Sequence, residues 1–510
     1  TRNTRNSTDF NYNVNLNYDL TDSFDITVRA AEQRTTSKDQ LYRPTTLLFE
    51  GNAVSPTRRG FASHGTYDLS TKVYEVFGTL DKTWGETQMV ITGGYSYNQI
   101  NANGMYLGLG DFPDNSLDYS DAIQNSQDLL NDGYVQANSY ASPDEKLIAM
   151  FGRVNLSFSN LFFNASLRRE GSSKFGADQK WGTFPAASLG YNISEEDFFE
   201  PLKGIFNFFK IKASYGISGN AEIGNYLNES RYTQRNYNLQ NGITLSNIPD
   251  DELGWESAAQ TNFAVSMELF DGKIRADIDY YEKVTSDLLL PFPVSAITGV
   301  NNVTANIGEM QNNGFEVILG ATLADKDDLS WDVELQLARN TNEVTDLGDN
   351  PDGINIPGFG NTAIYRGKPV GIQNMPVWGG IDPATGEDLW VQQSDGMLLT
   401  TSQVEGQFNS LNAFFSNNNV PFGNPYPDYT GGFSTDLRYK NWSVSALLSF
   451  AVGQNYVASG EIINSKYFAS SMNLTPLRHM LGRWRSPGDV TNIGQLTTDP
   501  TIWSRTTQYV

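Results

Sequence analysis

Few side chains in this 510-residue sequence suit covalent or acid–base catalysis. Cysteine is absent, which removes disulfides, zinc–thiolate sites and cysteine nucleophiles. The two histidines, His64 and His479, lie far apart, and no nucleophile motif surrounds either one. Because nucleophilic catalysis needs a base placed beside the nucleophile, both are interpreted as surface-loop residues. The sequence therefore predicts a protein that is not an enzyme.

Acidic clusters in polar segments suggest a second chemistry, the binding of calcium by carboxylates. One cluster comprises Asp111, Asp114, Asp118 and Asp121, and another comprises Asp382 and Asp388. Neither cluster has the ligand spacing of an EF-hand loop. Solvated loop carboxylates are the simpler interpretation, so no cofactor is expected, and calcium in these loops is kept as an alternative.

Aromatic residues in long polar segments suit a third chemistry, the stacking and hydrogen bonding of sugars or similar solutes. The candidate contacts are Trp378, Trp390, Tyr232 and Tyr237. The same side chains equally fit packing within a loop or contact with a covering partner. Which interpretation holds depends on the elements that position them.

Those elements are strands, because apolar and polar residues alternate strictly in many places. In the clearest run Phe10, Tyr12, Val14, Leu16 and Tyr18 alternate with asparagines. Successive side chains of a strand point to opposite faces, so one face is apolar and the other fully polar. A membrane barrel uses such a pattern to face lipid on one side and a wet lumen on the other.

Composition agrees with a membrane barrel and excludes other classes. No apolar run approaches the length of a transmembrane helix, and a mean hydropathy of -0.41 suits a barrel, in which only alternate residues meet lipid. The formal net charge of -23 argues against a nucleic-acid partner, because a polyanion would be repelled. The expected location is the outer membrane, in contact with membrane lipid and lipopolysaccharide.

Alternation recurs often enough to predict about fourteen strands of roughly ten residues each, the length that crosses a bilayer. Further strong runs lie at 24–29, 88–98, 153–158, 163–168, 209–215, 263–280, 331–337 and 433–450, with weaker ones at 72–84, 181–191 and 312–323. The residues expected to face lipid are Phe10, Tyr12, Val14, Leu16, Tyr18, Phe263, Val265, Met267, Leu269, Ile274, Ile278, Trp331, Val333, Leu335, Trp442, Val444 and Leu448.

Connections between these strands alternate between short and long. Strands ending at Asp19, Trp84, Phe158, Leu269, Leu323 and Tyr439 turn within a few residues, whereas long connections are expected at 32–71, 99–145, 218–259, 284–311 and 342–429, with a shorter one at 170–180. Segment 192–207 is an exception among the short turns and could start a small helix. Outer-membrane barrels have short periplasmic turns and long outer loops. This parity leads us to expect a barrel fragment that starts and stops on the outer face.

Several stretches resemble one family, the SusC/RagA-like TonB-dependent transporters of Bacteroidota outer membranes. They are Leu167–Gly176, Lys180–Pro185, Lys212–Asn220, Gly254–Glu256, Asp279–Lys283, Asn312–Glu316, Gly379–Gly386, Pro427–Gly432 and Arg483–Arg485. The resemblance spans about 150–510, and barrel character alone supports the part before it. Most of these residues are interpreted as architecture, with Trp181 and Trp255 suited to a membrane interface.

The resemblance implies a 22-stranded all-β transmembrane barrel, of which residues 1–510 supply about fourteen strands. It also implies an N-terminal plug, a TonB box and final strands, none of which is expected within this sequence. The implied function is TonB-dependent import of oligosaccharides, peptides or other large nutrients, with a SusD-like surface lipoprotein as a lid. The alternatives are a structural or assembly component of a larger outer-membrane complex without transport activity and, less favoured, a passive porin.

Overall fold

The computed structural model describes most of the chain in two compact units. The described residues are 2–48, 59–115, 123–130, 136–237, 240–300, 302–348, 353–355, 362–455 and 478–495. Unit 1 comprises Thr1–Glu195, Lys212–Ala259 and Val294–Asn306, and unit 2 comprises Glu196–Ile211, Gln260–Pro293 and Ile307–Val510.

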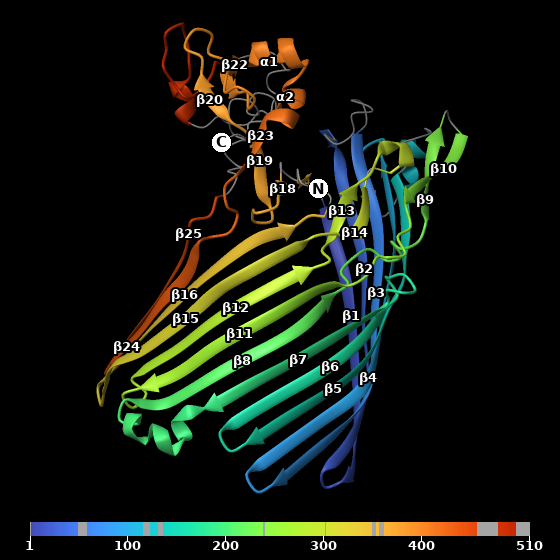
Figure 1. Cartoon of the computed structure of the whole chain (residues 1–510). Helices are drawn as coiled ribbons and strands as arrows, with labels where there is room; N and C mark the ends of the chain where they lie inside the picture. Colours follow the sequence, from blue (N-terminus) through green and yellow to red (C-terminus); the bar gives the residue numbers. More distant parts are fainter. Residues whose placement is uncertain are drawn as a thin grey trace. The chain divides into compact units, whose positions relative to one another are not determined.

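Fourteen strands form one antiparallel sheet whose hydrogen-bonded neighbours follow chain order (Figure 1). They are β1 (Arg2–Thr21), β2 (Phe24–Leu48), β3 (Arg59–Trp84), β4 (Thr87–Gly110), β5 (Gln136–Phe158), β6 (Leu161–Ser172), β7 (Trp181–Asn192), β8 (Phe206–Asn220), β11 (Glu256–Leu269), β12 (Ile274–Ser286), β15 (Glu309–Lys326), β16 (Leu329–Asp346), β24 (Tyr429–Tyr439) and β25 (Trp442–Val452). The expected number of strands and the all-β class are confirmed.

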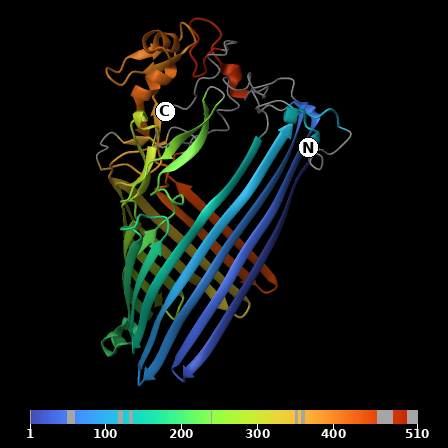
Figure 2. The ribbon, with the colours of Figure 1, turned by 90° about the vertical axis from the view of Figure 1, so that its right-hand side faces the viewer.

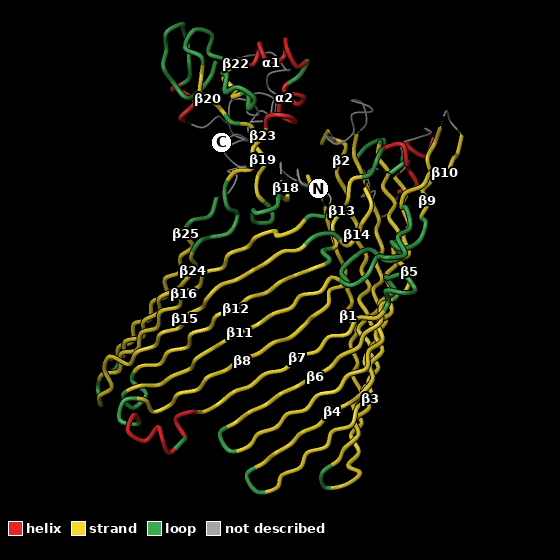
Figure 3. Tube along the Cα trace, in the orientation of Figure 1, coloured by secondary structure: helices red, strands yellow, loops and turns green. Residues whose placement is uncertain are grey.

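The remaining elements are short and belong to the connections, where Figure 3 shows helices and loops among the strands. The strands are β9 (Arg231–Tyr237), β10 (Gln240–Asn247), β13 (Leu289–Pro293), β14 (Asn302–Asn306), β17 (Ile354–Asn355), β18 (Thr362–Ile364), β19 (Ile372–Pro376), β20 (Trp378–Ile381), β21 (Asp388–Val391), β22 (Leu398–Thr400) and β23 (Asn419–Phe422). The helices are α1 (Thr401–Phe408) and α2 (Leu411–Asn418), with 3-10 turns at Ile123–Asn125, Gln127–Leu130, Ile193–Glu195, Asp197–Leu202, Ala296–Thr298 and Arg478–Gly482.

Tight turns join the strand pairs that were expected to be hairpins. Gly85 has φ +59° between β3 and β4, and Gly272 has φ +77° between β11 and β12. Left-handed backbone of this kind is least costly for glycine, which explains why the sequence signal was strong at these positions. The β15–β16 turn is Asp327–Asp328, so β15 runs three residues past the expected end at Leu323.

The strands are longer than expected, and the expected long loops are correspondingly shorter. β3 has 26 residues, and β2 and β3 remain paired from Phe24 and Leu80 to Arg43 and Phe61. The expected loop at 32–71 is therefore largely strand, as Figure 2 shows for the blue strands. Residues 32–40 of β2 are all polar, so the apolar alternation stops there, but backbone pairing does not require apolar side chains. The same reason explains the extension of β4 and β5 into 99–145.

Two connections contain folded structure. Segment 192–207, which was expected to start a small helix, holds two short 3-10 helices at Ile193–Glu195 and Asp197–Leu202. The expected loop at 342–429 holds a small folded region with its own apolar core of Trp390, Leu399, Val404, Leu411, Phe414 and Phe415. A separate cluster of Tyr42, Ala62 and Phe112 packs in unit 1.

Candidate functional site

The polar face of β1–β3 is built from hydrogen-bonded ladders. Arg29 on β2 donates to Asn15 Oδ1 on β1 at 2.9 Å and to Glu75 Oε2 on β3 at 2.9 Å. Thr27 donates its hydroxyl proton to Asn17 at 2.8 Å. The asparagines that alternate with apolar residues in β1 thus join charged side chains on neighbouring strands. Such a face suits contact with water and polar solutes.

The opposite face exposes the apolar residues that were expected to meet lipid. The most exposed are Trp442 at 78%, Tyr18 at 68%, and Leu16 and Leu448 at 64%. The others that are exposed are Phe10, Tyr12, Val14, Phe263, Ile274, Ile278, Trp331, Leu335 and Val444. Val265, Met267, Leu269 and Val333 are half-buried. Exposed apolar surface of this extent requires an apolar solvent or a partner, and lipid contact by these residues remains a prediction.

Several of the family-like stretches meet around Trp255 in unit 1. The Trp255 ring lies 5.2 Å from the ring of buried Phe175 and 5.3 Å from that of Phe184. Its indole nitrogen donates to the Lys180 carbonyl at 2.9 Å. A side chain at Gly219 would collide with Phe184, which explains on steric grounds why glycine occupies this position. The cluster fits the architectural role that was expected for these motifs.

We call the described residues 362–428 and 478–495 the loop unit, and its core fixes the two candidate tryptophans. Trp378 on β20 is paired in register with Trp390 on β21. Trp390 is only 3% exposed, its ring lies 4.9 Å from that of Phe415, and its indole donates to Thr401 Oγ1. Trp390 therefore packs inside the loop unit, and the expectation that it contacts a solute is corrected, because the core surrounds its ring. Trp378 is half-buried and donates to Asp388 at 3.2 Å.

A turn at 382–387 brings two of the family-like stretches together within the loop unit. Gly386 has φ +74°, and a Cβ atom there would lie 2.5 Å from the Trp484 ring. The Trp484 indole donates to the Pro383 carbonyl at 2.9 Å, and the amide of Gly488 donates to the same oxygen. Residues far apart in the sequence thus close one corner of the loop unit. No periodic pattern of residues predicts this contact.

A polar pocket of about 420 Å³ lies in unit 2 at the end of β16. Its lining is rich in charged, amide and phenol groups, and the polar members are Arg339, Asn340, Thr341, Asn342, Glu343, Lys368, Asn424, Tyr426 and Asp428. Arg339 lies over the ring of Tyr429 at 5.6 Å, which orients its guanidinium. Asn342 accepts from the Val370 amide at 2.8 Å and so holds the adjacent turn.

This pocket has the size and polarity of a site for a small part of a polar solute. Sequence reasoning missed it, because its lining comes from the end of β16 and from the two ends of segment 362–428, which are far apart in the sequence. One signal was the Pro427–Gly432 stretch, which contains Asp428.

The remaining candidates lie elsewhere. Tyr232 on β9 is 64% exposed, and the side chain of Tyr237 lies outside the described residues. His64 lies 3.4 Å from the Gln40 amide nitrogen, and the side chain of His479 is not among the described ones.

The acidic clusters have local partners. Asp118 and Asp121 lie outside the described residues. Asp382 accepts from the Thr385 hydroxyl at 2.7 Å and from the Ala384 amide, and these bonds lower the pKa of its carboxyl. Within the described ranges, no group of three or more candidate ligand residues is arranged to hold a metal ion.

Comparisons with known proteins identify the class. The family described as TonB dependent receptor-like, beta-barrel, matches residues 1–474. TonB-dependent receptor P3 of Formosa agariphila is 30% identical over 83% of this chain and 42% of its own length. TonB-dependent receptor SusC of Bacteroides thetaiotaomicron is 28% identical over 64% of this chain and 37% of its own length. The chain thus spans under half the length of these relatives.

A solved structure supports the fold. The structure titled as that of the RagAB peptide transporter superposes with a TM-score of 0.79 at 21% identity, covering 97% of this chain and 53% of the other. In the described part of this chain, no helix combines the length and apolarity needed to cross a membrane.

The chain belongs to the β-barrel family of TonB-dependent receptors. Its relatives include SusC, and its location is the outer membrane, so the expected SusC/RagA-like resemblance and localisation are both confirmed.

Proposed function

We propose that the whole protein imports a large nutrient across the outer membrane with energy supplied through TonB. The family match over residues 1–474 carries this proposal. The alternation of apolar and polar faces supports it, because the polar face of β1–β3 offers a hydrated wall to a solute. The protein is then a transporter rather than an enzyme.

The polar pocket is our proposed contact for the nutrient. Arg339, Lys368 and Tyr426 are exposed and present donors that fit carboxylates, amides or hydroxyls. An oligosaccharide or a peptide offers such groups in regular array. The name of the RagAB structure refers to peptide transport, and we propose oligosaccharides and peptides as the substrate class for this chain.

Deletion of the full gene in its host tests the import role. We expect the deletion strain to lose growth on one complex glycan or peptide source and to regain it on complementation. Normal growth of the deletion strain on every glycan and peptide tested would contradict the proposal.

Pocket variants then locate the contact. Complementation with Lys368→Ala should lower uptake of that nutrient, whereas Lys440→Ala, at the β24–β25 turn, should restore wild-type uptake. Equal uptake by both variants would remove the pocket from the transport route.

We further propose a SusD-like surface lipoprotein and TonB as partners. The first follows from the likeness to SusC, and the second from the family. Affinity purification of the full-length receptor from its own membrane should recover a lipoprotein in stoichiometric amount. Recovery of other stable outer-membrane partners, together with unchanged nutrient uptake in the deletion strain, would favour the scaffold alternative instead. High conductance of the intact protein in planar bilayers would favour a porin.

A further inference from the structure

The outward face of β2–β5 in unit 1 is ordered in bands along the strands. In one row across the sheet Glu32, Lys72, Gln99 and Lys146 are in register. The next row contains Tyr74 and Tyr97, whose rings are stacked at 6.3 Å. Two rows further along β3 and β4 lie Gly78 and Gly93, which face each other. Along β3 and β4, this face therefore carries first a charged row, then an aromatic row and, further on, a row of glycines.

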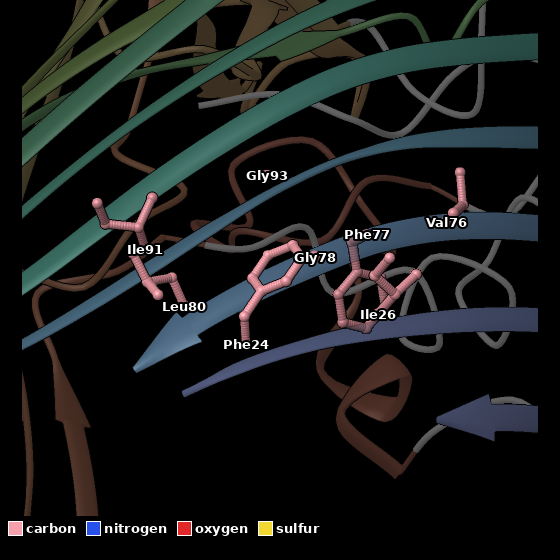
Figure 4. Close-up of a pocket in the computed structure, with 8 residues that line it drawn as sticks. All are labelled: Phe24, Ile26, Val76, Phe77, Gly78, Leu80, Ile91 and Gly93. Carbon is pink, nitrogen blue, oxygen red and sulfur yellow. The ribbon is translucent and has the colours of Figure 1, made fainter. Parts of the chain in front are cut away.

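An apolar hollow of about 430 Å³ lies at the glycine row (Figure 4). Its eight lining residues come from β2, β3 and β4, and none is charged: Phe24, Ile26, Val76, Phe77, Gly78, Leu80, Ile91 and Gly93. None of the lining side chains is polar, so a hydrocarbon chain fits the hollow better than a hydrated solute does.

The charged row also holds two carboxylates, and both accept hydrogen bonds from neutral side chains. Glu32 accepts from Tyr12 at 3.0 Å and from Ser70 at 3.0 Å. Asp144, close to this row, accepts from Gln99 at 2.7 Å and lies 3.9 Å from the exposed Lys146.

Lys72 on β3 is in register with Glu32 and attracts its carboxylate. The two lysines lie about 10 Å apart on β3 and β5, with Gln99 of β4 between them, and their ammonium groups are the charged donors that this row can turn toward an anion.

We propose that the outward face of β2–β5 binds one membrane lipid whose headgroup carries phosphomonoester groups. Lys72 and Lys146 donate to the phosphate oxygens, Gln99 lies between them, and one acyl chain descends past Tyr74 and Tyr97 into the apolar hollow. Lysine binds phosphate as a compact charge with rotatable donors. Tyrosine at this level is typical of the interface between headgroups and hydrocarbon.

The spacing along β3 agrees with this assignment. From Lys72 to Gly78 the strand rises six residues, or roughly 20 Å. Barrel strands are tilted by about 45°, so the depth is about 14 Å, close to half of a hydrocarbon core of about 30 Å. A lipid whose phosphates contact the lysines therefore ends its acyl chain near the hollow. Lys82 closes the band on the same face of β3, beyond Leu80.

The headgroup is tested with the full-length receptor in nanodiscs of phosphatidylcholine that contain diphosphoryl lipid A. Native mass spectrometry counts the glycolipid retained per receptor. The double variant Lys72→Gln/Lys146→Gln should retain about tenfold less, because two charge-assisted contacts are lost. Lys82→Gln, on the same strand and face, should retain the wild-type amount. Equal retention by the double variant and wild type would overturn the proposal, as would equal retention of the same glycolipid after removal of its phosphates.

The hollow is tested by filling it. A Cβ atom at Gly93 meets only an ordinary contact at 3.7 Å, so Gly93→Leu should fold and occupy the hollow. The control is Gly152→Leu, in the same row on β5 but outside the lining, where a Cβ atom meets nothing within 4 Å. Heat-modifiable migration on gels reports barrel folding for both. Gly93→Leu should lower glycolipid retention severalfold, and retention at the level of Gly152→Leu would remove the acyl chain from the hollow and with it the proposal.

Discussion

The outward wall of β1–β6 and the loop unit are stabilised in different ways, although both are made of strands and turns. In the wall each strand pairs along its full length with its neighbour, and large apolar side chains such as Leu16 remain exposed. In the loop unit the strands have only three to five residues, and stability depends on a buried core around Trp390 and Phe414. Exposed apolar surface of this extent is what we expect of a wall that faces lipid, whereas the loop unit has the buried core of a small aqueous domain.

The largest expected effect is a loss of stability in the loop unit alone. Phe414 is fully buried, so Phe414→Ala leaves a cavity and should cost about 3–5 kcal/mol of local stability. Limited proteolysis of the full-length receptor should then cut within 362–428, while heat-modifiable migration of the barrel is unchanged. Leu398→Ala is the control, because Leu398 is 51% exposed. Loss of barrel migration in Phe414→Ala would show that the two regions are not independent.

The second largest effect is a loss of stability of the wall in the membrane. Leu16→Arg places a charge on the face expected to meet lipid and should destabilise insertion by about 2–4 kcal/mol. Asn13→Arg puts the same charge on the polar face of the same strand, opposite Ala31, and should have a much smaller effect. Urea titration of folding into lipid vesicles measures both. A larger loss for Asn13→Arg would reverse the assignment of the two faces.

The same difference explains how much the sequence could predict. Strict alternation at Phe10–Tyr18 depends only on neighbours in the chain, so it predicted both the strand and the exposed face. The strand ends were missed because residues there, such as Thr36 and Asp68, pair through their backbones. Both side chains are polar, so no apolar alternation marks the pairing. In the loop unit the burial of Trp390 depends on Phe415, and that contact has no periodic signal. Family-like stretches located the Gly386 turn but not its contact with Trp484.

A matched pair of glycines sharpens the comparison at one corner of the loop unit. Gly386 and Gly396 have φ of +74° and +75°, but only Gly386 faces a ring, that of Trp484. Both alanine variants carry the backbone strain of about 1 kcal/mol, and Gly386→Ala adds the displacement of the indole. Hydrogen exchange of the amides in 478–495 should therefore rise more in Gly386→Ala. Equal exchange in the two variants would mean that the Trp484 contact contributes little.

The smallest effect is a pH dependence of the same turn. Hydrogen bonds from Thr385 and Ala384 lower the pKa of the Asp382 carboxyl below its ordinary value. A carboxyl with a lowered pKa in the folded state stabilises that state above the pKa of the unfolded chain, about 3.9, and this contribution is lost as the pH falls through the folded pKa. Exchange of the Ala384 amide should thus accelerate, beyond the intrinsic change, as the pH falls below about 4. Asp382→Asn, which cannot titrate, should remove that extra acceleration, and the wall, measured on β1 amides in the same samples, should not respond to the substitution. If the variant kept the wild-type pH profile, the acid sensitivity would belong to other carboxylates, such as Asp489, whose pKa the Arg485 and Ser486 amides also lower.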